Sequence, residues 1–249
     1  MTIADKLTLL ANTKEQQRVA FSIDKSVPWG DYMGKMVTNE FGQSTTTAVS
    51  QKLFTDTLTQ RFNDIGEQGK IGFGIGITNK LPTGMSQMQG TAIKGHENYG
   101  NYQYADGSVM TYVAAFYYRW GHADSPRYSK YGVNALDVKS IYDFADVTAA
   151  NAAGYTLHRA FYDDDKIVDG FFVDKYLCSN NAGKASSIKN GNPLSANSAN
   201  NPYSDLTGSP TNNLAGSIDA VKTRGTNFFP TTIFIQRALS LLSMAHAKA

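Results

Sequence analysis

Apolar residues recur at helical spacing at the start of the chain, where Ile3, Leu7 and Leu10 lie three or four positions apart. That spacing predicts a short amphipathic helix. A turn around Pro28 ends any helix before that residue. A helical piece as small as residues 1–41 cannot bury enough surface to fold alone. We therefore expect it to pack on copies of itself, on the rest of the chain or on another protein.

A narrower apolar seam runs through residues 42–70, behind a Ser/Thr cluster that supplies helix-capping oxygens. Its members recur at spacings of four, five, four and three, and they are Val49, Leu53, Leu58, Phe62 and Ile65. Gly66 and Gly69 end the pattern. Two interpretations stay open. A seam this narrow is typical of helices that pair with their own copies, as in a coiled-coil trimer, but an ordinary surface helix has a similar pattern.

The remaining residues, 71–249, have the mixed periodicity of an α+β domain, called the head below. β-branched, aromatic or alternating segments predict strands, and they are residues 71–77, 109–120, 136–140 and 171–178. The first of these is Gly-rich, but no helix signal follows it, so it lacks the context of a phosphate-binding loop. Asp146 predicts the N-cap of a helix that ends at Gly154.

A stronger helix is predicted over 234–247, with its apolar face made by Phe234, Ala238, Leu241, Leu242 and Ala245. Before it lies a stretch rich in Asn and Ser, residues 179–217. Polar loops of this length are either functional or poorly ordered. The turns at Asn192-Pro193 and Asn201-Pro202 would order it in part.

Charge and composition remove several classes of function. The net charge is +2 with no Lys/Arg cluster, so the basic patch of a nucleic-acid-binding protein is missing. No apolar run is long enough to cross a bilayer. The first six residues lack a secretory signal, so we expect synthesis in a cytoplasm without export by that route. Charged residues make up only 18%, and the many Tyr, Phe, Asn and Ser residues suit a contact surface.

Candidate chemistry is sparse. Cys178 is the only cysteine, which excludes an intrachain disulfide and a cysteine-based zinc cage. Asp163-Asp164-Asp165 lacks the spacing of a Ca²⁺ loop and is better explained as a solvated turn. His158 beside Arg159 fits a structural histidine better than a ligand-binding one. We therefore assign no catalytic residue, no metal site and no cofactor, although a pair of Asp residues for glycoside hydrolysis stays open.

The segment Asn98–Tyr104 is the best candidate for surface contact within the head. Tyr provides contact area at low entropic cost and Asn provides adaptable hydrogen bonds. The residues expected to touch a receptor are Tyr99, Asn101, Tyr102 and Tyr104. Packing of these Tyr rings into the core is the alternative.

Two N-terminal segments carry a family resemblance. Residues 43–58 are similar to an "STT…VSQK…TD.L" segment of bacteriophage tail-fibre proteins that leads into a trimeric stalk. The opening residues, followed by Val27-Pro28-Trp29 and Asp31-Tyr32, resemble the start of phage tail proteins. Phe54 departs from the pattern, where smaller residues are common. The resemblance implies virion docking by residues 1–41, through Leu7, Leu10, Trp29 and Tyr32, and trimerisation by residues 42–70.

The head resembles formylglycine-generating, sulfatase-modifying domains, which have a C-type-lectin-like fold. Residues 109–120 match a "V…PaFyyg" strand, and Phe172–Tyr176 with Ser179-Asn180 match "F.iDkyEVTN", although Leu177-Cys178 replaces Glu-Val. The oxidase activity of that family needs a cysteine pair, which this chain lacks. The family's C-terminal Trp-Glu and Arg-Gly-Gly segments are also missing. Both a complete head and one that continues past residue 249 stay open.

Together these features predict an α+β protein with an N-terminal helical segment, a short trimeric helical stalk and a C-type-lectin-like head at 71–249. The expected function is non-catalytic host attachment by a homotrimer on the exterior of a virion. The expected partners are other tail proteins and a host-surface glycan or protein, without nucleic acid or membrane insertion. An architectural connector or decoration protein and a glycan-degrading fibre enzyme are the alternatives.

Overall fold

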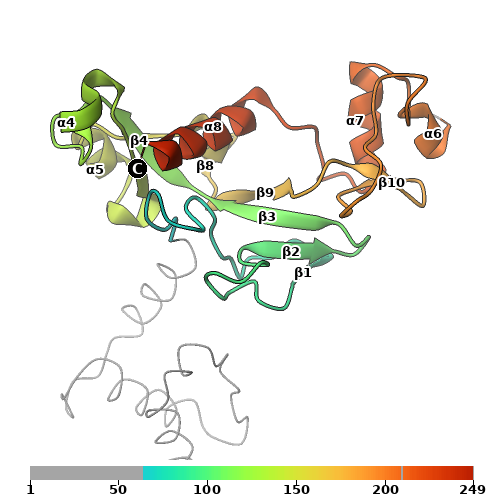
Figure 1. The fold of residues 1–249 in the computed structure, drawn as a ribbon, viewed down its shortest axis with the longest axis horizontal. Helices are drawn as coiled ribbons and strands as arrows, with labels where there is room; N and C mark the ends of the chain where they lie inside the picture. The colour runs from blue at the N-terminus through green and yellow to red at the C-terminus, as the bar shows by residue number, and fades with distance from the viewer. Residues whose placement is uncertain (1–63, 209, 249) are drawn as a thin grey trace, which may run out of the picture. The chain divides into compact units, whose positions relative to one another are not determined.

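A computed structural model describes residues 64–208 and 210–248 (Figure 1). The part described is a mixed α+β fold of several small antiparallel sheets with a few helices. The expected docking segment 1–41, with Leu7, Leu10, Trp29 and Tyr32, lies outside the described residues. So do Val49, Leu53, Leu58 and Phe62 of the expected seam.

The largest sheet has four strands in the order β1-β2-β3-β9, and every neighbouring pair is antiparallel. The strands are β1 (Met85–Gln87), β2 (Asn101–Tyr104), β3 (Val109–Ala114) and β9 (Gly170–Asp174). β3 is central, and β1 and β9 are the two edges. The prediction of a strand at 171–178 is confirmed for its first half only, because the chain leaves the sheet after Asp174.

A three-stranded sheet of order β5-β4-β6 continues from β3, because only Ala115 separates β3 from β4. Its strands are β4 (Phe116–Trp120), β5 (Leu136–Ser140) and β6 (Thr156–Leu157). The predicted strand pair at 109–120 and the strand at 136–140 are thus confirmed. Arg119 on β4 pairs with Asp137 on β5 at 3.2 Å, with both side chains buried. Tyr155 also donates a hydrogen bond to Asp137, so one carboxylate ties together three segments.

Two hairpins complete the strands, β7 (Tyr162–Asp163) with β8 (Lys166–Ile167) and β10 (Ser179–Asn181) with β11 (Lys184–Ser186). The α-helices are α4 (Tyr128–Tyr131), α5 (Val147–Ala152), α6 (Ser204–Thr207), α7 (Leu214–Lys222) and α8 (Ile233–Ala247). Three short 3-10 turns are η2 (Gly132–Asn134), η3 (Ile141–Asp143) and η4 (Arg159–Phe161). None of the helices within the described ranges is long and apolar enough to cross a membrane.

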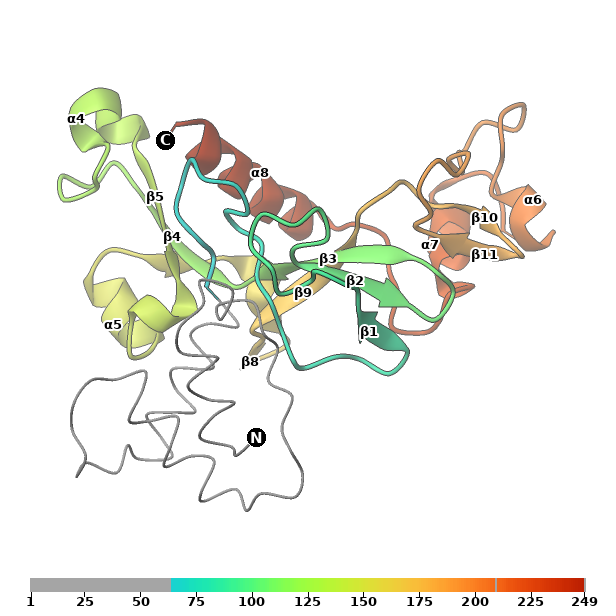
Figure 2. The ribbon, with the colours of Figure 1, turned by 60° about the horizontal axis from the view of Figure 1, so that its bottom comes forward.

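The main core forms where α8 packs over the junction of the two larger sheets (Figures 1 and 2). Tyr102, Phe116 and Phe161 are fully buried there. The predicted helix over 234–247 is confirmed, and four members of its expected face are buried. Phe234 was wrongly included: it is 46% exposed, and Ile235 takes the inward position instead. The helix begins at Ile233, with Thr232 as its N-cap.

A second, smaller cluster of Ala185, Leu206 and Ala220 organises residues 178–223, which we call the small lobe. In both ribbon views its elements β10, α6 and α7 lie at the opposite end from α4 (Figures 1 and 2). The stretch expected to be one long polar loop therefore contains a hairpin and two helices. A side-chain amide adds to this apolar packing in the loop between β11 and α6, where Asn201 Nδ2 donates to the carbonyls of Asn192 and Pro193 at 2.8 and 2.9 Å.

The prediction of a strand at 71–77 is wrong. Gly72 and Gly74 adopt positive φ angles of 85° and 79°, which bend the segment into turns. Only Ile75 makes a β-bridge, to Val113. Ile65, the last residue of the expected seam, is the one member that the structure describes. It is 4% exposed, lies in non-helical backbone and packs in the main core.

Candidate ligand-binding recess

A cavity of about 410 Å³ opens between the four-stranded sheet and the segment that leads from α7 into α8. We call it the aromatic recess. Its apolar walls come from the sheet and from the covering segment, and they include Met85, Tyr104, Met110, Phe171, Phe172, Val173, Phe228, Phe229 and Ile235. Thr83, Thr226, Asn227 and Thr231 add polar groups at its margin. A mostly apolar lining with a few convergent polar groups is typical of ligand-binding sites.

Aromatic contacts hold the walls of the recess in place. Phe172 meets the rings of Tyr102 and Tyr112 at centroid distances of 5.2 and 5.1 Å. Tyr104 meets Phe228 edge-on at 4.9 Å, which joins the sheet to the covering segment. Phe229 is 56% exposed and leaves an apolar ring at the entrance. The recess therefore has a packed floor and an accessible rim.

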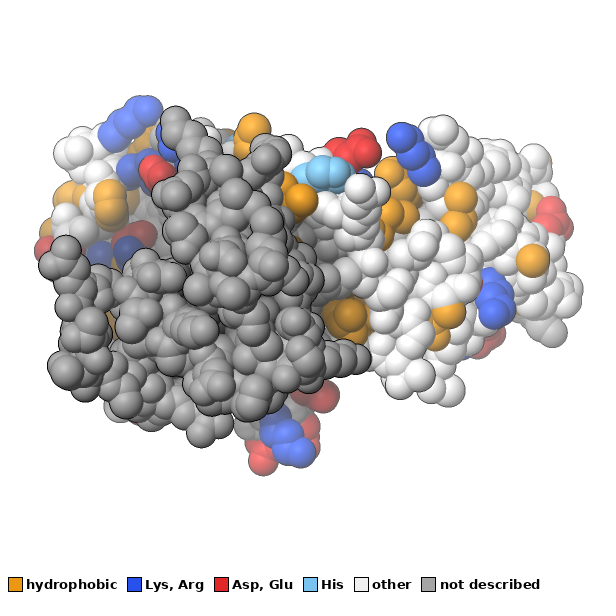
Figure 3. Space-filling view, turned by 90° about the horizontal axis from the view of Figure 1, so that it is seen from below, with side chains coloured by type: hydrophobic (Ala, Val, Ile, Leu, Met, Phe, Trp, Pro, Cys, Tyr) orange, Lys and Arg blue, Asp and Glu red, His pale blue; other side chains and the backbone are white. Residues whose placement is uncertain are grey.

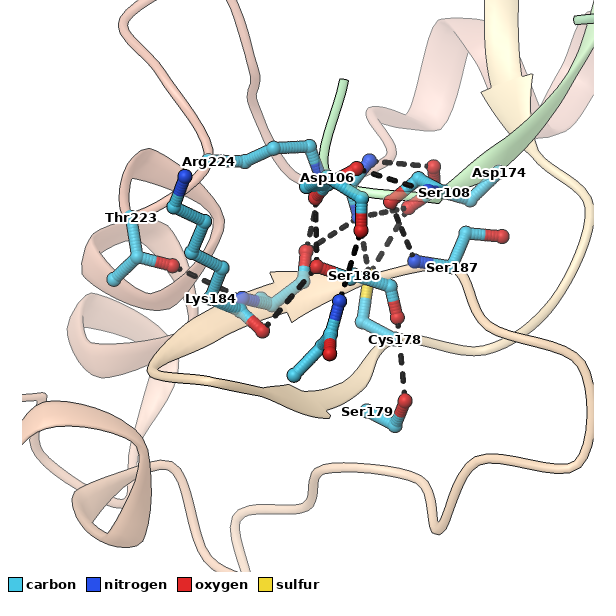
Figure 4. Close-up of polar contacts among 12 residues, drawn as sticks. Asp106, Ser108, Asp174, Cys178, Ser179, Lys184, Ser186, Ser187, Thr223 and Arg224 are labelled. Carbon is cyan, nitrogen blue, oxygen red and sulfur yellow. Dashed lines mark hydrogen bonds and ion pairs between the residues drawn. The ribbon is translucent and has the colours of Figure 1, made fainter. Parts of the chain in front are cut away.

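Arg224 lines the recess with a side chain only 2% exposed. Its Nη1 and Nη2 donate to the two carboxylate oxygens of Asp174 at 2.7 and 3.1 Å (Figure 4). Its Nε donates to the carbonyl of Ala185 at 2.9 Å and lies 3.4 Å from Asp106 Oδ2. The guanidinium also stands 4.7 Å above the ring of Phe228. A planar, five-donor group suits a site where several acceptors converge.

Asp106 supplies the second carboxylate of this group. It follows β2 and accepts hydrogen bonds from the Ser186 hydroxyl at 2.6 Å and the Ser108 amide at 2.9 Å. Burial alone raises its pKa, but these hydrogen bonds and the charge of Arg224 outweigh burial and bring the pKa below its ordinary value. Burial likewise opposes the charge of Arg224, and the bonded Asp174 reverses that effect, so the pKa of Arg224 is raised.

Cys178 completes the group, which we call the arginine cluster: Asp106, Asp174, Cys178, Ser186 and Arg224. The Cys178 thiol donates to Asp174 Oδ2 at 3.0 Å, and Arg224 Nη2 lies 3.4 Å from its sulfur. Burial, followed by the negative charge of Asp174, raises the pKa of Cys178 to about 12. A thiol that stays protonated is a poor nucleophile and a poor metal ligand. The cysteine therefore packs and donates rather than reacts.

The arginine cluster ties the small lobe to the four-stranded sheet. Ala185 and Ser186 belong to β11, Asp174 ends β9, and Asp106 lies in the β2–β3 turn. Neighbouring backbone contacts reinforce this junction, since Val109 donates its amide to the carbonyl of Ser187 at 2.9 Å. Because Arg224 is already saturated with acceptors, it is not free to bind an anionic ligand. Its role at the recess is to position the walls.

The residues expected to touch a receptor divide into two pairs. Tyr102 is fully buried and Asn101 is 4% exposed. The Tyr102 hydroxyl donates to the carbonyl of Thr78 at 3.0 Å and accepts from its amide. These two side chains therefore serve packing, which is the alternative that the sequence left open. Tyr99 and Tyr104 are half-buried, and Tyr104 lines the aromatic recess.

The acidic turn and the histidine that were weighed as ligand residues lie in a hairpin turn and in the core. Asp164 and Asp165 form the turn of the β7–β8 hairpin, with Asp164 at a φ of 58°. His158 is 6% exposed, caps η4 and stacks on Phe116. Burial, with a smaller contribution from the charge of Arg237, lowers its pKa, so it stays neutral near pH 7. In the ranges that the structure covers, no three His, Cys, Asp or Glu side chains group as metal ligands.

The sequence did not indicate Arg224, Phe228 or Phe229 as site residues. They lie more than 45 positions after β9 in the chain, in a stretch with no recognisable motif. On the face shown in Figure 3, charged side chains are scattered over the described part and form no large patch of one sign. Comparison with protein-family models, with curated proteins and with solved structures gave no match.

Proposed function

We propose that this chain is a non-catalytic attachment protein of a bacteriophage virion, either a tail fibre or a receptor-binding component. The aromatic recess is the observation that carries the head's part of the proposal. Its walls are apolar and aromatic, and its two charged side chains, Asp174 and Arg224, are bonded to each other. Such a cavity offers contact area and no free acid, base or nucleophile, which suits binding better than catalysis.

The phage attribution rests on the N-terminal residues. The segment 43–58 and the turn at Val27–Tyr32 occur in the order found in phage tail proteins. In the proposal, residues 1–41 dock to another virion protein, residues 42–70 form the trimer, and the head faces the host. The low charge and high Tyr, Asn and Ser content are in keeping with an exposed appendage.

A C-type-lectin-like head belongs to the same proposal. The two segments that resemble that fold are neighbours in space: β3 carries the first and β9 the second, in antiparallel register from Met110–Asp174 to Ala114–Gly170. Asp174 of the second segment orients Arg224 and so anchors the small lobe. This adjacency is in keeping with the resemblance.

Two other functions make different predictions. A connector or decoration protein would leave adsorption unchanged when it is deleted, while virions assemble or survive poorly. A glycan-degrading fibre enzyme would release oligosaccharides from host-surface glycans. The ion-paired state of Asp174 disfavours the second at the recess, because a retaining or inverting glycosidase needs two carboxyl groups that face the substrate.

The test uses the purified full chain on a panel of bacterial isolates. Light scattering should give the mass of a trimer, and the protein should bind susceptible cells and compete with virion adsorption. Virions without the protein should fail to adsorb, with no oligosaccharide released by the protein itself. A monomer at micromolar concentration would contradict the stalk, and normal adsorption without the protein would contradict attachment.

A further inference from the structure

Strand β9 is an edge strand, and its residues Phe171 to Asp174 line the aromatic recess. It pairs only with β3 in the sheet order β1-β2-β3-β9. The Lys175 amide donates to the backbone carbonyl of Val109 at 3.0 Å, and the Ala115 amide donates to the backbone carbonyl of Asp169 at 2.8 Å. Backbone groups alternate in direction along an antiparallel ladder. Residues 171 and 173 therefore bond to β3, while residues 170, 172 and 174 direct their backbone groups outward.

Within residues 64–208 and 210–248, the outward backbone groups of β9 have no hydrogen-bond partner. No residue in 64–208 or 210–248 hydrogen-bonds to the backbone amide or carbonyl of Phe172. Yet the Phe172 side chain is half-buried and its ring is fixed by two tyrosines. A rigid edge with unpaired donors and acceptors is a template for another extended chain.

The two edges of this sheet differ. At the far edge, β1 has three residues, and Ser86 and Gln87 are exposed and polar. At the near edge, Phe171, Phe172 and Val173 form an apolar run with no Pro or Lys. Natural edge strands are usually protected by shortness, charge or Pro. β1 has such protection, and the middle of β9 does not.

The recess supplies pockets with the periodicity of a strand. Phe172 and Asp174 point to one face of the sheet, together with Met110 opposite Asp174 and Tyr104 on β2. Phe171 and Val173, which belong to the opposite face, also line the cavity, so the recess reaches the edge of β9. Side chains at alternate positions of an added strand would enter it.

We propose that β9 binds an extended peptide segment of a partner protein by strand addition, with apolar side chains of that segment in the aromatic recess. Polypeptide backbone is the ligand that matches the outward amides and carbonyls at their two-residue repeat. A saccharide or another small molecule would fill the recess without pairing with the strand edge. The inference concerns the recess alone and holds whether or not the protein belongs to a virion.

The experiment begins with selection of random linear dodecapeptides by mRNA display on the full chain. Selected peptides should carry apolar residues at alternate positions. N-methylation of single backbone amides of the peptide should weaken binding about tenfold at every second position and little at the positions between, because only alternate amides face β9. Hydrogen exchange should show the Phe172 and Asp174 amides unprotected in the free protein and protected in the complex.

Phe229→Ala removes the exposed ring at the rim of the recess and should weaken peptide binding about tenfold. Leu214→Ala is the matched control, since Leu214 is 77% exposed on α7 and does not line the cavity. It should leave the affinity unchanged. Both changes affect exposed side chains, so both variants should fold as the parent does.

Four outcomes would overturn the proposal. Peptides that bind regardless of backbone N-methylation would show recognition without strand addition. Peptides whose affinity is unchanged by Phe229→Ala would bind outside the recess. A Phe172 amide already protected in the free full chain would show that the protein itself covers this edge. No enriched peptide, together with an oligosaccharide whose binding is lost in Phe229→Ala, would assign the recess to a saccharide. The last result would leave host attachment intact, so failure of this inference and of the proposed function can be told apart.

Discussion

The guanidinium of Arg224 donates two hydrogen bonds to the carboxylate of Asp174, although 50 positions separate the two residues in the chain. Asp174 ends a strand of the largest sheet, and Arg224 follows the last helix of the small lobe. The pair therefore connects two parts of the molecule that have separate apolar clusters. Because the guanidinium is buried, the loss of either partner has a large energetic consequence.

Arg224→Met should lower the free energy of unfolding by about 3–5 kcal/mol, because it leaves the carboxylates of Asp106 and Asp174 without a counter-charge. Arg224→Lys should recover only part of that loss, since an ammonium cannot donate to all the acceptors at once. Urea denaturation followed by circular dichroism measures both. Lys80→Ala is the control: Lys80 pairs with Asp169, but its side chain is 76% exposed, and the expected change is below about 1 kcal/mol. Equal losses of stability in Arg224→Met and Lys80→Ala would contradict the role of Arg224 as a buried counter-charge.

Stability should depend on Asp106 in acid. Its folded pKa lies below the ordinary value of 3.8, so the stabilisation is present above pH 4 and is lost as the pH falls through the folded pKa. Asp106→Asn should be less stable than the parent at pH 7 and less sensitive to acidification below pH 4. Denaturation midpoints between pH 2 and pH 7 measure the slope. Asp165→Asn, at the exposed hairpin turn, should keep the parental acid response.

Cys178 should resist thiol reagents in the native protein. A thiol with a pKa of about 12 has, at pH 8, on the order of a thousandfold less thiolate than a cysteine of ordinary pKa. Reaction with Ellman's reagent at pH 8 should therefore be slow in buffer and fast in urea. Since this is the only cysteine, the colour reports on one site. Rapid reaction of the folded protein would show that the contact with Asp174 is not maintained.

Two substitutions on α8 should separate its buried and exposed faces. Leu241 is 8% exposed in the main core, so Leu241→Ala should cost about 2–5 kcal/mol of unfolding free energy. Phe234, at 46% exposure, should cost less than about 1 kcal/mol when changed to Ala. Thermal or urea unfolding measures both losses. A large loss of unfolding free energy in Phe234→Ala would show that Phe234 belongs to the buried face, as periodicity alone predicts.

Local patterns were enough for several elements. The strands at 109–120 and 136–140 and the helices after Asp146 and within 234–247 follow from residue type, periodicity and capping. The predicted strand at 71–77 is wrong because Gly72 and Gly74 adopt positive φ, which the alternation of apolar residues does not reveal. The prediction that Phe234 is buried is wrong for a related reason. Periodicity does not fix which of two neighbouring apolar residues at the border of a helical face is buried, and tertiary contacts bury Ile235 instead.

By itself the sequence determined that the described part is an α+β fold, that Cys178 stands alone, and where β3, β4 and β5 run. Only the tertiary structure decided that Tyr102 is core while Tyr104 lines a recess, although the two lie two positions apart on one face of β2. It also brought Arg224 and Phe228 to the end of β9. The physical reason is that burial and charge pairing depend on neighbours distant in the chain, which local propensity does not encode.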